Sequence, residues 1–415
     1  MLANYYKTAV RHIARSRFHA IINIVGLSTG IAFTLLIAAY CWSEKQVNHQ
    51  LKNADQQYFL RSVWKDPNMG LAITTMGQLA LALKTNYPGL IANYYRWDGI
   101  SSVVSRGDAH FRESIQLGDS TLLQVYGFPL LSGDAQTALN NPFSVVITDD
   151  KAMKYFGRLD VVGEALIIDN FSGSRQPFKV TGVIKKPARN SVTQFNDNND
   201  NGIFVPSSNL SFFGRNMDWT NSAIVSYVEL QKGVRPEALE GPVRHLLQVN
   251  TPPNIRDNLR VEPVPITDYY LEANGGTVEK MIYTLSFVAL FILGMAIINF
   301  INLSVSRSHT RLKEIGIRKV LGGLRRQLRM QFLTESILLS LGSTAVALLI
   351  YVCTRRLFSE MLGSDIPDLM TLPALGWVLI LLFALFTGWL AGLYPATMLS
   401  SLSSIDALKS KAGTV

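Results

Sequence analysis

The segment AIINIVGLSTGIAFTLLIAAYCW, residues 20–42, is an unbroken apolar run near the start of the chain. Three further runs of similar length lie near the end, at 281–305, 332–353 and 372–394. Each run has about 20 residues or more, so each can cross a hydrocarbon core of ~30 Å as a helix. The sequence therefore predicts a membrane protein with four transmembrane α-helices, placed one plus three. A large mixed α/β domain, 43–280, is inserted between helices 1 and 2.

The first run is predicted to be a retained helix and not a cleaved signal peptide. Its apolar stretch is longer than the roughly 7–15 residues of a signal-peptide core. A lipoprotein site at Cys41 needs a small residue before the cysteine, and Tyr40 stands there. In the preceding segment, 1–19, apolar and basic residues are spaced as in an amphipathic helix that lies against a membrane.

Lys and Arg are unevenly distributed along the chain, whose formal net charge is +9. Basic residues predominate in segments 1–19, 306–331 and 395–415, which together hold only two acids. Because Lys and Arg accumulate in short loops on the cytoplasmic side of a membrane, these three segments are predicted to be cytoplasmic. The domain 43–280 and the short loop 354–371 are then predicted to lie outside.

The predicted outer domain carries 23 basic and 24 acidic residues, so it is close to neutral. A protein that binds nucleic acid needs a basic patch on its soluble surface. The positive charge of this chain instead follows the membrane topology. We therefore expect the lipid bilayer as a partner and no nucleic acid.

The outer domain is expected to be mixed α and β. Short runs rich in β-branched and aromatic residues predict strands at 58–63, 100–104, 144–147, 165–168, 178–183, 202–205 and 222–230. Helices are predicted at 79–86, 120–126, 151–156 and 236–248. The polar stretch 43–60 lacks Pro and Gly and can continue the first helix outward. Residues 276–280 can extend the second helix in the same way.

Sequence motifs for catalysis, metal binding and ATP hydrolysis are absent. There is no G-x-x-x-x-G-K-[S/T] phosphate loop, no G-x-S-x-G, and no histidine pair at metal-ligand spacing. The carboxylates of Asp149 and Asp150 precede a predicted helix, where capping and the helix dipole explain them. Residues 197–202, DNNDNG, begin like a calcium loop, but Ser208 stands where the bidentate glutamate belongs. The chain is thus predicted to be no enzyme and to need no cofactor or metal.

The strongest local signal is RLKEIGIRKVLGG, residues 311–323, in the predicted cytoplasmic loop 306–331. Its Ile, Val and Leu residues form an apolar set beside a dense basic face. Charge alone assigns no role here, because any short inner loop gathers Lys and Arg and amphipathic helices rest on lipid. The order of the residues is more informative than the composition.

With its flanks, this segment resembles the FtsX-like permeases of ABC transporters, particularly the MacB-type branch. The matching residues are 298–303 (INFINL), 313–319 (KEIGIRK), Gly322, 331–332 (QF) and 335–336 (ES). The family often has Gly-Ala where this chain has Gly322-Gly323. In the outer domain the matching blocks are 128–134 (FPLLSGD), 144–148 (SVVIT), Ala152, 155–157 (YFG), Gly163 and 178–183 (FKVTGV). The resemblance covers essentially the whole chain in order.

The resemblance implies an architecture and a set of partners. Residues 43–280 would form a MacB-like periplasmic core domain, with an inserted subdomain at about 130–215. The loop 306–331 would dock on a separate ABC ATPase subunit, and a second copy or a related permease subunit would complete the transporter. A periplasmic adaptor is a further candidate partner. The location implied is a bacterial inner membrane, with both termini cytoplasmic. Some relatives carry two such units, so the chain as half of a longer permease stays open.

The resemblance also points to residues that would couple the chain to the ATPase. They are Lys313, Glu314, Ile315, Gly316, Ile317, Arg318, Lys319 and Gly322. Gly316 would permit close approach, and Arg318 and Lys319 would pair with acidic groups of the ATPase.

Three polar residues inside the predicted spans are candidates for a structural or functional role. Asn299 and Asn302 are expected to hydrogen-bond between helices. Glu335 lies near the cytoplasmic start of its helix, where it would contact the coupling loop or pair with a residue such as Arg329.

The function that follows is a permease subunit that passes ATP-driven motion through its helices to the outer domain, here termed mechanotransmission. Its task would be export or extraction of a substrate from the outer side of the inner membrane. The alternative is an envelope signalling or scaffold protein of the FtsX type, which regulates a periplasmic partner without transport. A membrane-bound enzyme is the third class, and no catalytic motif favours it.

Overall fold

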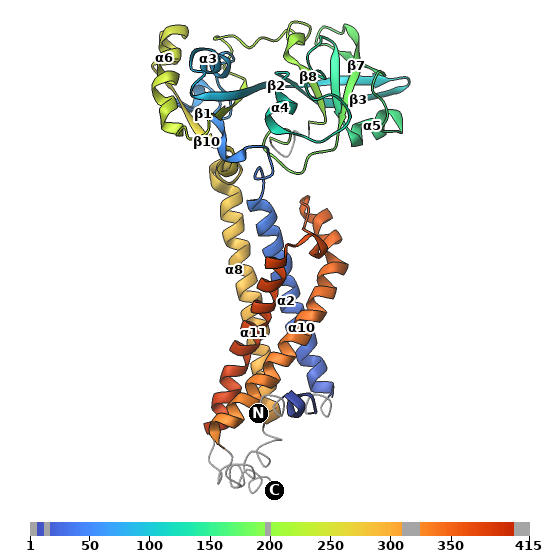
Figure 1. Ribbon diagram of the computed structural model, residues 1–415, viewed down its shortest axis with the longest axis vertical. Coiled ribbons are helices and arrows are strands. Elements are labelled where there is room, and N and C mark those ends of the chain that lie inside the picture. Colours follow the sequence, from blue (N-terminus) through green and yellow to red (C-terminus); the bar gives the residue numbers. More distant parts are fainter. Residues whose placement is uncertain (1–5, 12–16, 196–200, 309–323, 402–415) are drawn as a thin grey trace. The chain divides into compact units, whose positions relative to one another are not determined.

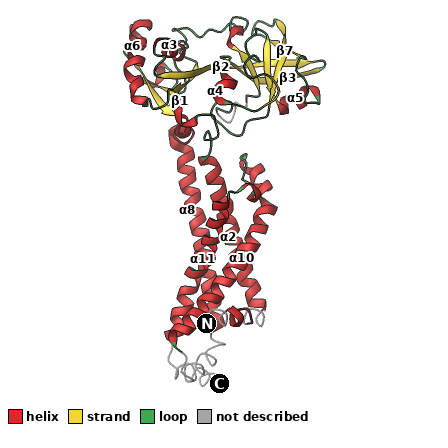
Figure 2. Ribbon diagram, viewed as in Figure 1, coloured by secondary structure: helices red, strands yellow, loops and turns green. Residues whose placement is uncertain are grey.

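The computed structural model describes residues 6–11, 17–195, 201–308 and 324–401. The chain divides into two compact units. We call the first the helical unit, Met1–Lys45 with Glu279–Val415, and the second the α/β domain, Gln46–Val278. All of the described strands belong to the α/β domain, and long helices build the helical unit (Figure 2).

Four long helices form the described core of the helical unit (Figure 1). They are α2 (Arg17–Lys45), α8 (Ile266–Ser308), α10 (Arg325–Leu362) and α11 (Ala374–Ser401). Each contains a stretch long and apolar enough to cross a membrane. A helix suits this environment because it satisfies its backbone hydrogen bonds internally. The four helices overlap the four predicted spans, and α8 and α10 extend well beyond 281–305 and 332–353.

The helices α2 and α8 pack through small residues. A Cβ atom on Gly30 would lie 2.4 Å from the Cβ of Ala296, and one on Gly26 would lie 3.1 Å from the Nδ2 of Asn299. The two glycines are four residues apart, so they share one face of α2. Small residues at this spacing let two backbones approach closely in lipid, where van der Waals contact drives helix association.

The helices α10 and α11 pack in the same way. A Cβ atom on Gly388 would lie 2.8 Å from the α10 backbone, and one on Gly392 would lie 2.8 Å from the Cβ of Ser336. At the same contact, the hydroxyl of Ser340 donates to the carbonyl oxygen of Ala384 at 2.8 Å. Each of these two helix pairs therefore meets through a pair of glycines one turn apart.

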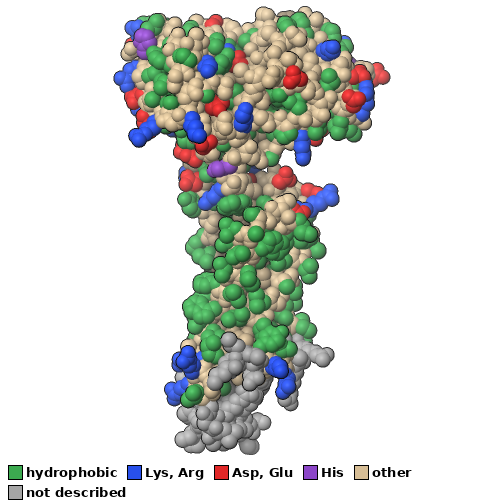
Figure 3. Space-filling view, viewed as in Figure 1, with side chains coloured by type: hydrophobic (Ala, Val, Ile, Leu, Met, Phe, Trp, Pro, Cys, Tyr) green, Lys and Arg blue, Asp and Glu red, His purple; other side chains and the backbone are tan. Residues whose placement is uncertain are grey.

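Large apolar side chains cover the surface of the helical unit (Figure 3). They include Phe33, Phe287, Phe291, Leu349, Leu382 and Phe386, which are all exposed within this single chain. In a lipid bilayer such side chains contact acyl chains, which are as apolar as leucine. This surface is the one expected of helices surrounded by lipid.

The α/β domain is built on one sheet with helices against it. Its strands are β1 (Gln57–Trp64), β2 (Ile91–Arg106), β3 (Ala109–Gly118), β4 (Leu130–Gly133), β5 (Ser144–Thr148), β6 (Ala165–Asp169), β7 (Arg175–Ile184), β8 (Ile203–Pro206), β9 (Val225–Leu230) and β10 (Leu259–Pro265). Its helices include α3 (Leu79–Asn86), α4 (Leu122–Tyr126), α5 (Asp149–Phe156), α6 (Glu240–Asn250) and α7 (Pro253–Arg256). The strand order is β10-β1-β9-β2-β3-β8-β5-β7-β4, and β6 pairs with both β2 and β7.

The 16-residue strand β2 joins two lobes of this sheet. Its first half, from Ile91 to Trp97, pairs with β9. Its second half, from Trp97 to Arg106, pairs with β3. We call β10, β1 and β9 with α3 and α6 the β1 lobe, and β3, β8, β5, β7 and β4 with α5 the β5 lobe.

Three clusters of buried side chains stabilise the domain. One lies in the β1 lobe between the sheet and α3 and α6, and includes Leu60, Leu83 and Leu246. A second lies in the β5 lobe around Phe178. The third contains residues of both lobes, among them Phe59, Trp97 and Phe204, together with Ile266 and Tyr269 from the first turn of α8. The start of α8 is therefore part of the central core of the domain.

A strand or helix is present at each predicted position of the domain. Most ends differ by a few residues, but β2 begins at Ile91, well before the predicted 100, and the helix predicted at 236–248 is a 3-10 turn, Pro236–Leu239, followed by α6. Strands β3, β4 and β10 were not predicted. Charged residues interrupt the apolar pattern of β3, charged residues and prolines interrupt that of β10, and β4 has only four residues, LLSG. Continuation of the first helix through 43–60 is wrong. The helix α2 ends at Lys45, and Asn48 takes a positive φ of 70°, which is incompatible with a right-handed helix. The subdomain boundaries at about 130 and 215 stay a prediction.

Candidate functional site

The predicted ATPase-coupling residues, Lys313 to Lys319 and Gly322, lie outside the described residues. The structure instead shows the two helices that hold the ends of this loop. The helix α8 ends at Ser308, and α10 begins at Arg325. At the start of α10 the backbone N–H of Leu324 donates to the side-chain oxygen of Gln327 at 3.3 Å, which satisfies one of the groups left unpaired at a helix end.

A row of polar side chains is buried along α10. Glu335 and Ser336 are each 6% exposed, and Ser340, Ser343 and Thr344 follow on the same helix with little or no exposure. Burial of these groups in a membrane bundle is costly unless neighbouring helices supply partners. Ser336 and Ser340 of this row lie against Gly388 and Gly392 of α11, which explains how α11 comes close there.

Asn299 and Asn302, the other two predicted intramembrane polar residues, occupy a different place. Both residues belong to α8, and each is exposed within this single chain. Asn299 lies beside Gly26 at the contact between α2 and α8. Their predicted hydrogen bonds between helices stay a prediction.

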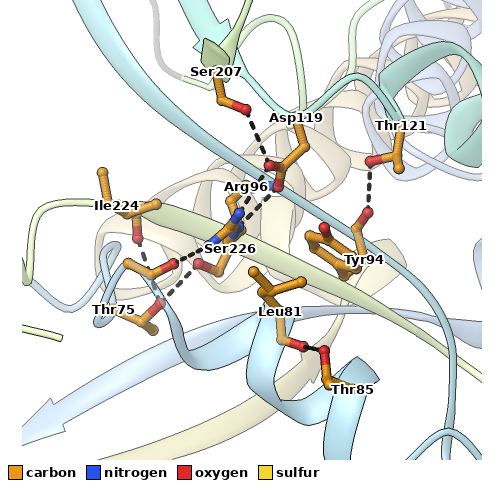
Figure 4. Close-up of polar contacts among 11 residues, drawn as sticks. Thr75, Leu81, Thr85, Tyr94, Arg96, Asp119, Thr121, Ser207, Ile224 and Ser226 are labelled. Carbon is orange, nitrogen blue, oxygen red and sulfur yellow. Dashed lines mark hydrogen bonds and ion pairs between the residues drawn. The ribbon is translucent and has the colours of Figure 1, made fainter. Parts of the chain in front are cut away.

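A buried ion pair lies between the two lobes of the α/β domain, and sequence reasoning missed it. Arg96 in β2 donates from Nε and Nη2 to the two carboxylate oxygens of Asp119, each at 2.9 Å (Figure 4). The backbone N–H of Arg96 donates to the same carboxylate at 3.0 Å. Both side chains are only 7% exposed. The two residues are 23 positions apart and neither belongs to a motif, so no sequence signal pairs them.

The ion pair connects segments from both lobes. Nη1 of Arg96 donates to the carbonyl oxygen of Gly77 at 2.6 Å, just before α3 in the β1 lobe. The hydroxyl of Ser207, just after β8 in the β5 lobe, donates to Asp119 at 3.4 Å. Nearby, Thr75 donates to Ser226 of β9 at 2.9 Å (Figure 4). The guanidinium and the carboxylate therefore bring three separate chain segments together against β2.

A cleft of about 420 Å³ opens in the β1 lobe between the end of β1, the start of β10 and α6. Three arginines line it, and each has an acidic partner: Arg244 with Glu240 at 2.6 Å, Arg256 with Asp257 at 3.5 Å and Arg260 with Glu262 at 3.3 Å. These pairs leave little net positive charge for an anionic ligand. Among the described residues, no three His, Cys, Asp or Glu side chains are grouped as metal ligands would be.

Two family models match this arrangement of helices and inserted domain. The MacB-like periplasmic core domain matches residues 20–246, which is more than half of the chain. The FtsX-like permease C-terminal domain matches residues 286–404, over the last three long helices. This chain belongs to the MacB-type, FtsX-like permeases. It is thus a membrane protein of the ABC transporter permease family, with an extracytoplasmic domain between its first two spans.

Curated relatives of the permease are export proteins. The pyoverdine export ATP-binding/permease protein PvdT of Pseudomonas syringae pv. syringae is 23% identical over 95% of this chain and 58% of its own length. The macrolide export ATP-binding/permease protein MacB of Bdellovibrio bacteriovorus is 28% identical over 64% of this chain and 38% of its own length. The permease therefore spans about half the length of the curated relatives it matches.

A solved structure that resembles the permease is the periplasmic region of MacB from Actinobacillus actinomycetemcomitans. It covers 57% of this chain and 95% of that chain, at 14% identity and a TM-score of 0.39.

The carboxylate pair Asp149-Asp150 has the structural role expected from the sequence, with one correction. The two residues form the first turn of α5 and do not precede it, and Thr148 is the N-cap. The carboxylate of Asp149 accepts from the backbone N–H of Asp150 at 3.0 Å and of Lys186 at 2.9 Å. Negative charge at a helix N-terminus is stabilised by the helix dipole.

A second buried carboxylate of the permease, Glu113 of β3, holds α5 against the sheet. Its side chain, 6% exposed, accepts from the ammonium groups of Lys151 at 2.5 Å and Lys154 at 2.6 Å, and from the hydroxyl of Tyr155 at 3.0 Å. Burial would raise the pKa of Glu113, but the hydrogen bonds from the two lysines outweigh it, and the pKa is lowered. The ionised carboxylate therefore stabilises the folded domain.

We expect Glu113→Gln to lower the free energy of unfolding by about 1.5–3 kcal/mol at pH 7, because hydrogen bonds to a charged group are lost. Because the pKa of this carboxylate is lower in the folded state, its ionisation stabilises the fold at pH values above the unfolded-state pKa of about 4.3. This stabilisation disappears as the pH falls through the folded-state pKa. The gap between wild type and E113Q should therefore close on acidification below pH ~4.3. Thermal unfolding of the full chain in detergent from pH 3 to 7 measures it. Glu240→Gln, which removes an exposed pair with Arg244, is the control. A gap that stays constant with pH would contradict this role.

Proposed function

We propose that this permease couples ATP hydrolysis by a separate ABC ATPase subunit to movement of its extracytoplasmic domain. The observation that carries this proposal is the helix α8. It runs for 43 residues, from Ile266 in the central core of the α/β domain to Ser308, where the segment matching the family's coupling loop begins. This one segment, which contains two glycines with positive φ, Gly275 at 71° and Gly276 at 72°, thus connects the two ends that mechanotransmission must link.

The ATPase is proposed to be a separate polypeptide. Support for an ATPase partner comes from the names of the curated relatives, which are ATP-binding/permease proteins, and from the match to the FtsX-like permease C-terminal domain over 286–404. The basic segment 311–323 would dock on the ATPase from the cytoplasm, with both termini on the same side of a bacterial inner membrane.

A second copy, or a related permease subunit, is proposed to cover the exposed face of α8. The residues of this face recur at helical spacing: Tyr283, Phe287, Gly294, Ile298 and Asn302. A Cβ atom on Gly294 would meet no other atom within 4 Å, so a second helix has room to approach there. The amide of Asn302 would find a hydrogen-bond partner on such a helix, whereas the acyl chains of lipid provide none.

The proposed work is export or extraction of a substrate from the outer side of the membrane. Support comes from the names of the relatives, which are given for export of pyoverdine and of macrolides. The extracytoplasmic domain, and not the membrane bundle, would contact the cargo or an adaptor.

We expect Gly316→Trp and Arg318→Glu to abolish stimulation of the ATPase while the chain stays inserted in the membrane. The indole would prevent close approach at the coupling loop, and the acidic side chain would repel acidic groups of the ATPase. The measurement is affinity purification of the chain from its native membrane, followed by ATPase assays of the complex in proteoliposomes.

Lys409→Glu, a charge reversal in the C-terminal tail, is the control and should leave stimulation unchanged. Failure to recover any ATPase with the wild-type chain would instead favour the signalling or scaffold function. Full stimulation in both loop variants would overturn the docking assignment.

A further inference from the structure

One asparagine holds together the two segments through which the α/β domain is connected to the membrane helices. Asn48 lies three residues after the end of α2 and is fully buried. Its Nδ2 donates to the carbonyl oxygen of Ile266, the first residue of α8, at 2.7 Å. The same Nδ2 donates to the hydroxyl of Ser191 at 2.9 Å, and Oδ1 accepts from the backbone N–H of Ser191 at 2.6 Å.

Ser191 belongs to the loop between β7 and β8, and this loop packs on the first turn of α8. The ring of Phe195 stacks on Tyr269 with centroids 5.5 Å apart. The guanidinium of Arg189 lies over the ring of Tyr270, 5.1 Å from its centroid. The carbonyl oxygen of Ser191 also accepts from the hydroxyl of Tyr227 in β9 at 2.6 Å. The described part of this loop, 185–195, is thus fixed to both α8 and the sheet.

The far end of the loop reaches the β5 lobe. The backbone N–H of Asn201 donates to the carbonyl oxygen of Thr193 at 3.0 Å, and its Nδ2 donates to Gln116 of β3 at 3.3 Å. Strand β8 follows directly and pairs with β3 and β5. Asn48 and Ile266 are therefore connected to the strands of the β5 lobe by hydrogen bonds at Ser191, Thr193 and Asn201 and by the short chain segment between Ser191 and Thr193.

The chemistry of the site requires an asparagine. The backbone at position 48 has a φ of 70°, which glycine, asparagine and aspartate adopt most readily. Of these, only asparagine has both the donor that Ile266 needs and the acceptor that Ser191 needs. Aspartate at this position would place a carboxylate oxygen against the carbonyl oxygen of Ile266.

We propose that Asn48 is a coupling lock, a positioning residue that makes the entry segment, the first turn of α8 and the 185–195 loop move as one body. Displacement of the first turn of α8 is then transmitted to the β5 lobe and not absorbed between these segments. The inference rests on the proposed function, because it specifies how motion of α8 enters the extracytoplasmic domain.

The test compares Asn48→Gly and Asn48→Asp with Asn53→Gly in the full chain, purified with its co-purifying ATPase in lipid nanodiscs. Asn53 also has a positive φ, 50°, but is exposed and bonds through its side chain to Glu229 alone. Glycine suits the backbone at both positions, so the two glycine variants differ in the hydrogen bonds that they remove. Amide hydrogen exchange measures whether the segments joined by Asn48 open more easily. Stimulation of the ATPase by substrate measures whether this connection matters for coupling.

We expect both Asn48 variants to accelerate amide exchange at 188–195 and 266–273 roughly tenfold, with exchange in β5 and β7 unchanged. Substrate-dependent stimulation of the ATPase should fall about fivefold or more, while basal activity is retained. Asn53→Gly should leave both measurements at wild-type values.

Accelerated exchange with full stimulation would overturn the lock and leave the proposed function intact. Unchanged exchange at 188–195 and 266–273 would overturn it as well. A wild-type chain that yields no stimulated ATPase would refute the proposed function, and the lock with it.

Discussion

Arg96→Met should lower the free energy of unfolding of the extracytoplasmic domain more than any other single substitution proposed for that domain. The substitution leaves the carboxylate of Asp119, 7% exposed, without its two guanidinium hydrogen bonds, and removes the donor to Gly77. Breaking a buried pair by removal of one partner costs about 3–5 kcal/mol, because an uncompensated charge stays buried. Denaturant unfolding of the full chain in detergent, followed by tryptophan fluorescence, measures the loss.

The matched control is Arg61→Met. Arg61 forms two ion pairs, with Glu262 at 3.3 Å and Glu272 at 3.1 Å, but its side chain is 35% exposed. Exposed pairs contribute about 0–1 kcal/mol, so this variant should stay close to wild type. The double variant Arg96→Met with Asp119→Leu should recover part of the stability, since it removes the unpaired charge. Equal losses for Arg96→Met and Arg61→Met would show that burial of the pair does not matter.

Gly388→Leu should separate α11 from α10 in the helical unit. Even a Cβ atom at this position would lie 2.8 Å from the backbone of α10 and 2.9 Å from the Cβ of Ser340, and backbone cannot move aside as a flexible side chain can. Overpacking a tight contact costs about 1–3 kcal/mol, and the hydrogen bond from Ser340 to Ala384 is lost as well. The expected result is a lower midpoint of thermal aggregation in detergent, measured by size-exclusion chromatography after heating.

Gly342→Leu on α10 is the control for this change. A Cβ atom on Gly342 would meet nothing within 4 Å, so a leucine there has room. Leucine also favours a helix over glycine by close to 1 kcal/mol, which should keep this variant at or above wild-type stability. If both variants aggregate at the same temperature, the close approach of α10 and α11 is not what holds them together.

Local patterns in the sequence were sufficient for the elements whose residues carry a single signal. The span 20–42 is recognisable because its run of apolar residues matches the thickness of a bilayer. Strand β5 was predicted because its five residues are β-branched or small and all buried. Strand β10 was missed because two prolines and alternating charges conceal its buried residues. Its place beside β1 depends on a partner about 200 residues away.

The candidate site was predictable only where a motif marks it. The segment 311–323 was found through the order of its residues, although its structure lies outside the described part of the chain. Asn48 gave no signal, since an isolated asparagine in a polar stretch usually belongs to a turn. The sequence even predicted a continuing helix there. Asn48 became visible as a lock only when Ser191 and Ile266, 143 and 218 positions away, were brought to its amide.

The sequence by itself determined the number of membrane spans, the insertion of a large domain between the first two, and the family. These properties depend on the length, charge and order of contiguous residues. Only the tertiary structure decided that Arg96 meets Asp119, that Gly388 fits against α10, and that Asn48 joins α8 to the 185–195 loop. Each of these contacts depends on residues far apart in the chain, whose meeting follows from packing of the whole domain or bundle and leaves no periodic trace in the sequence.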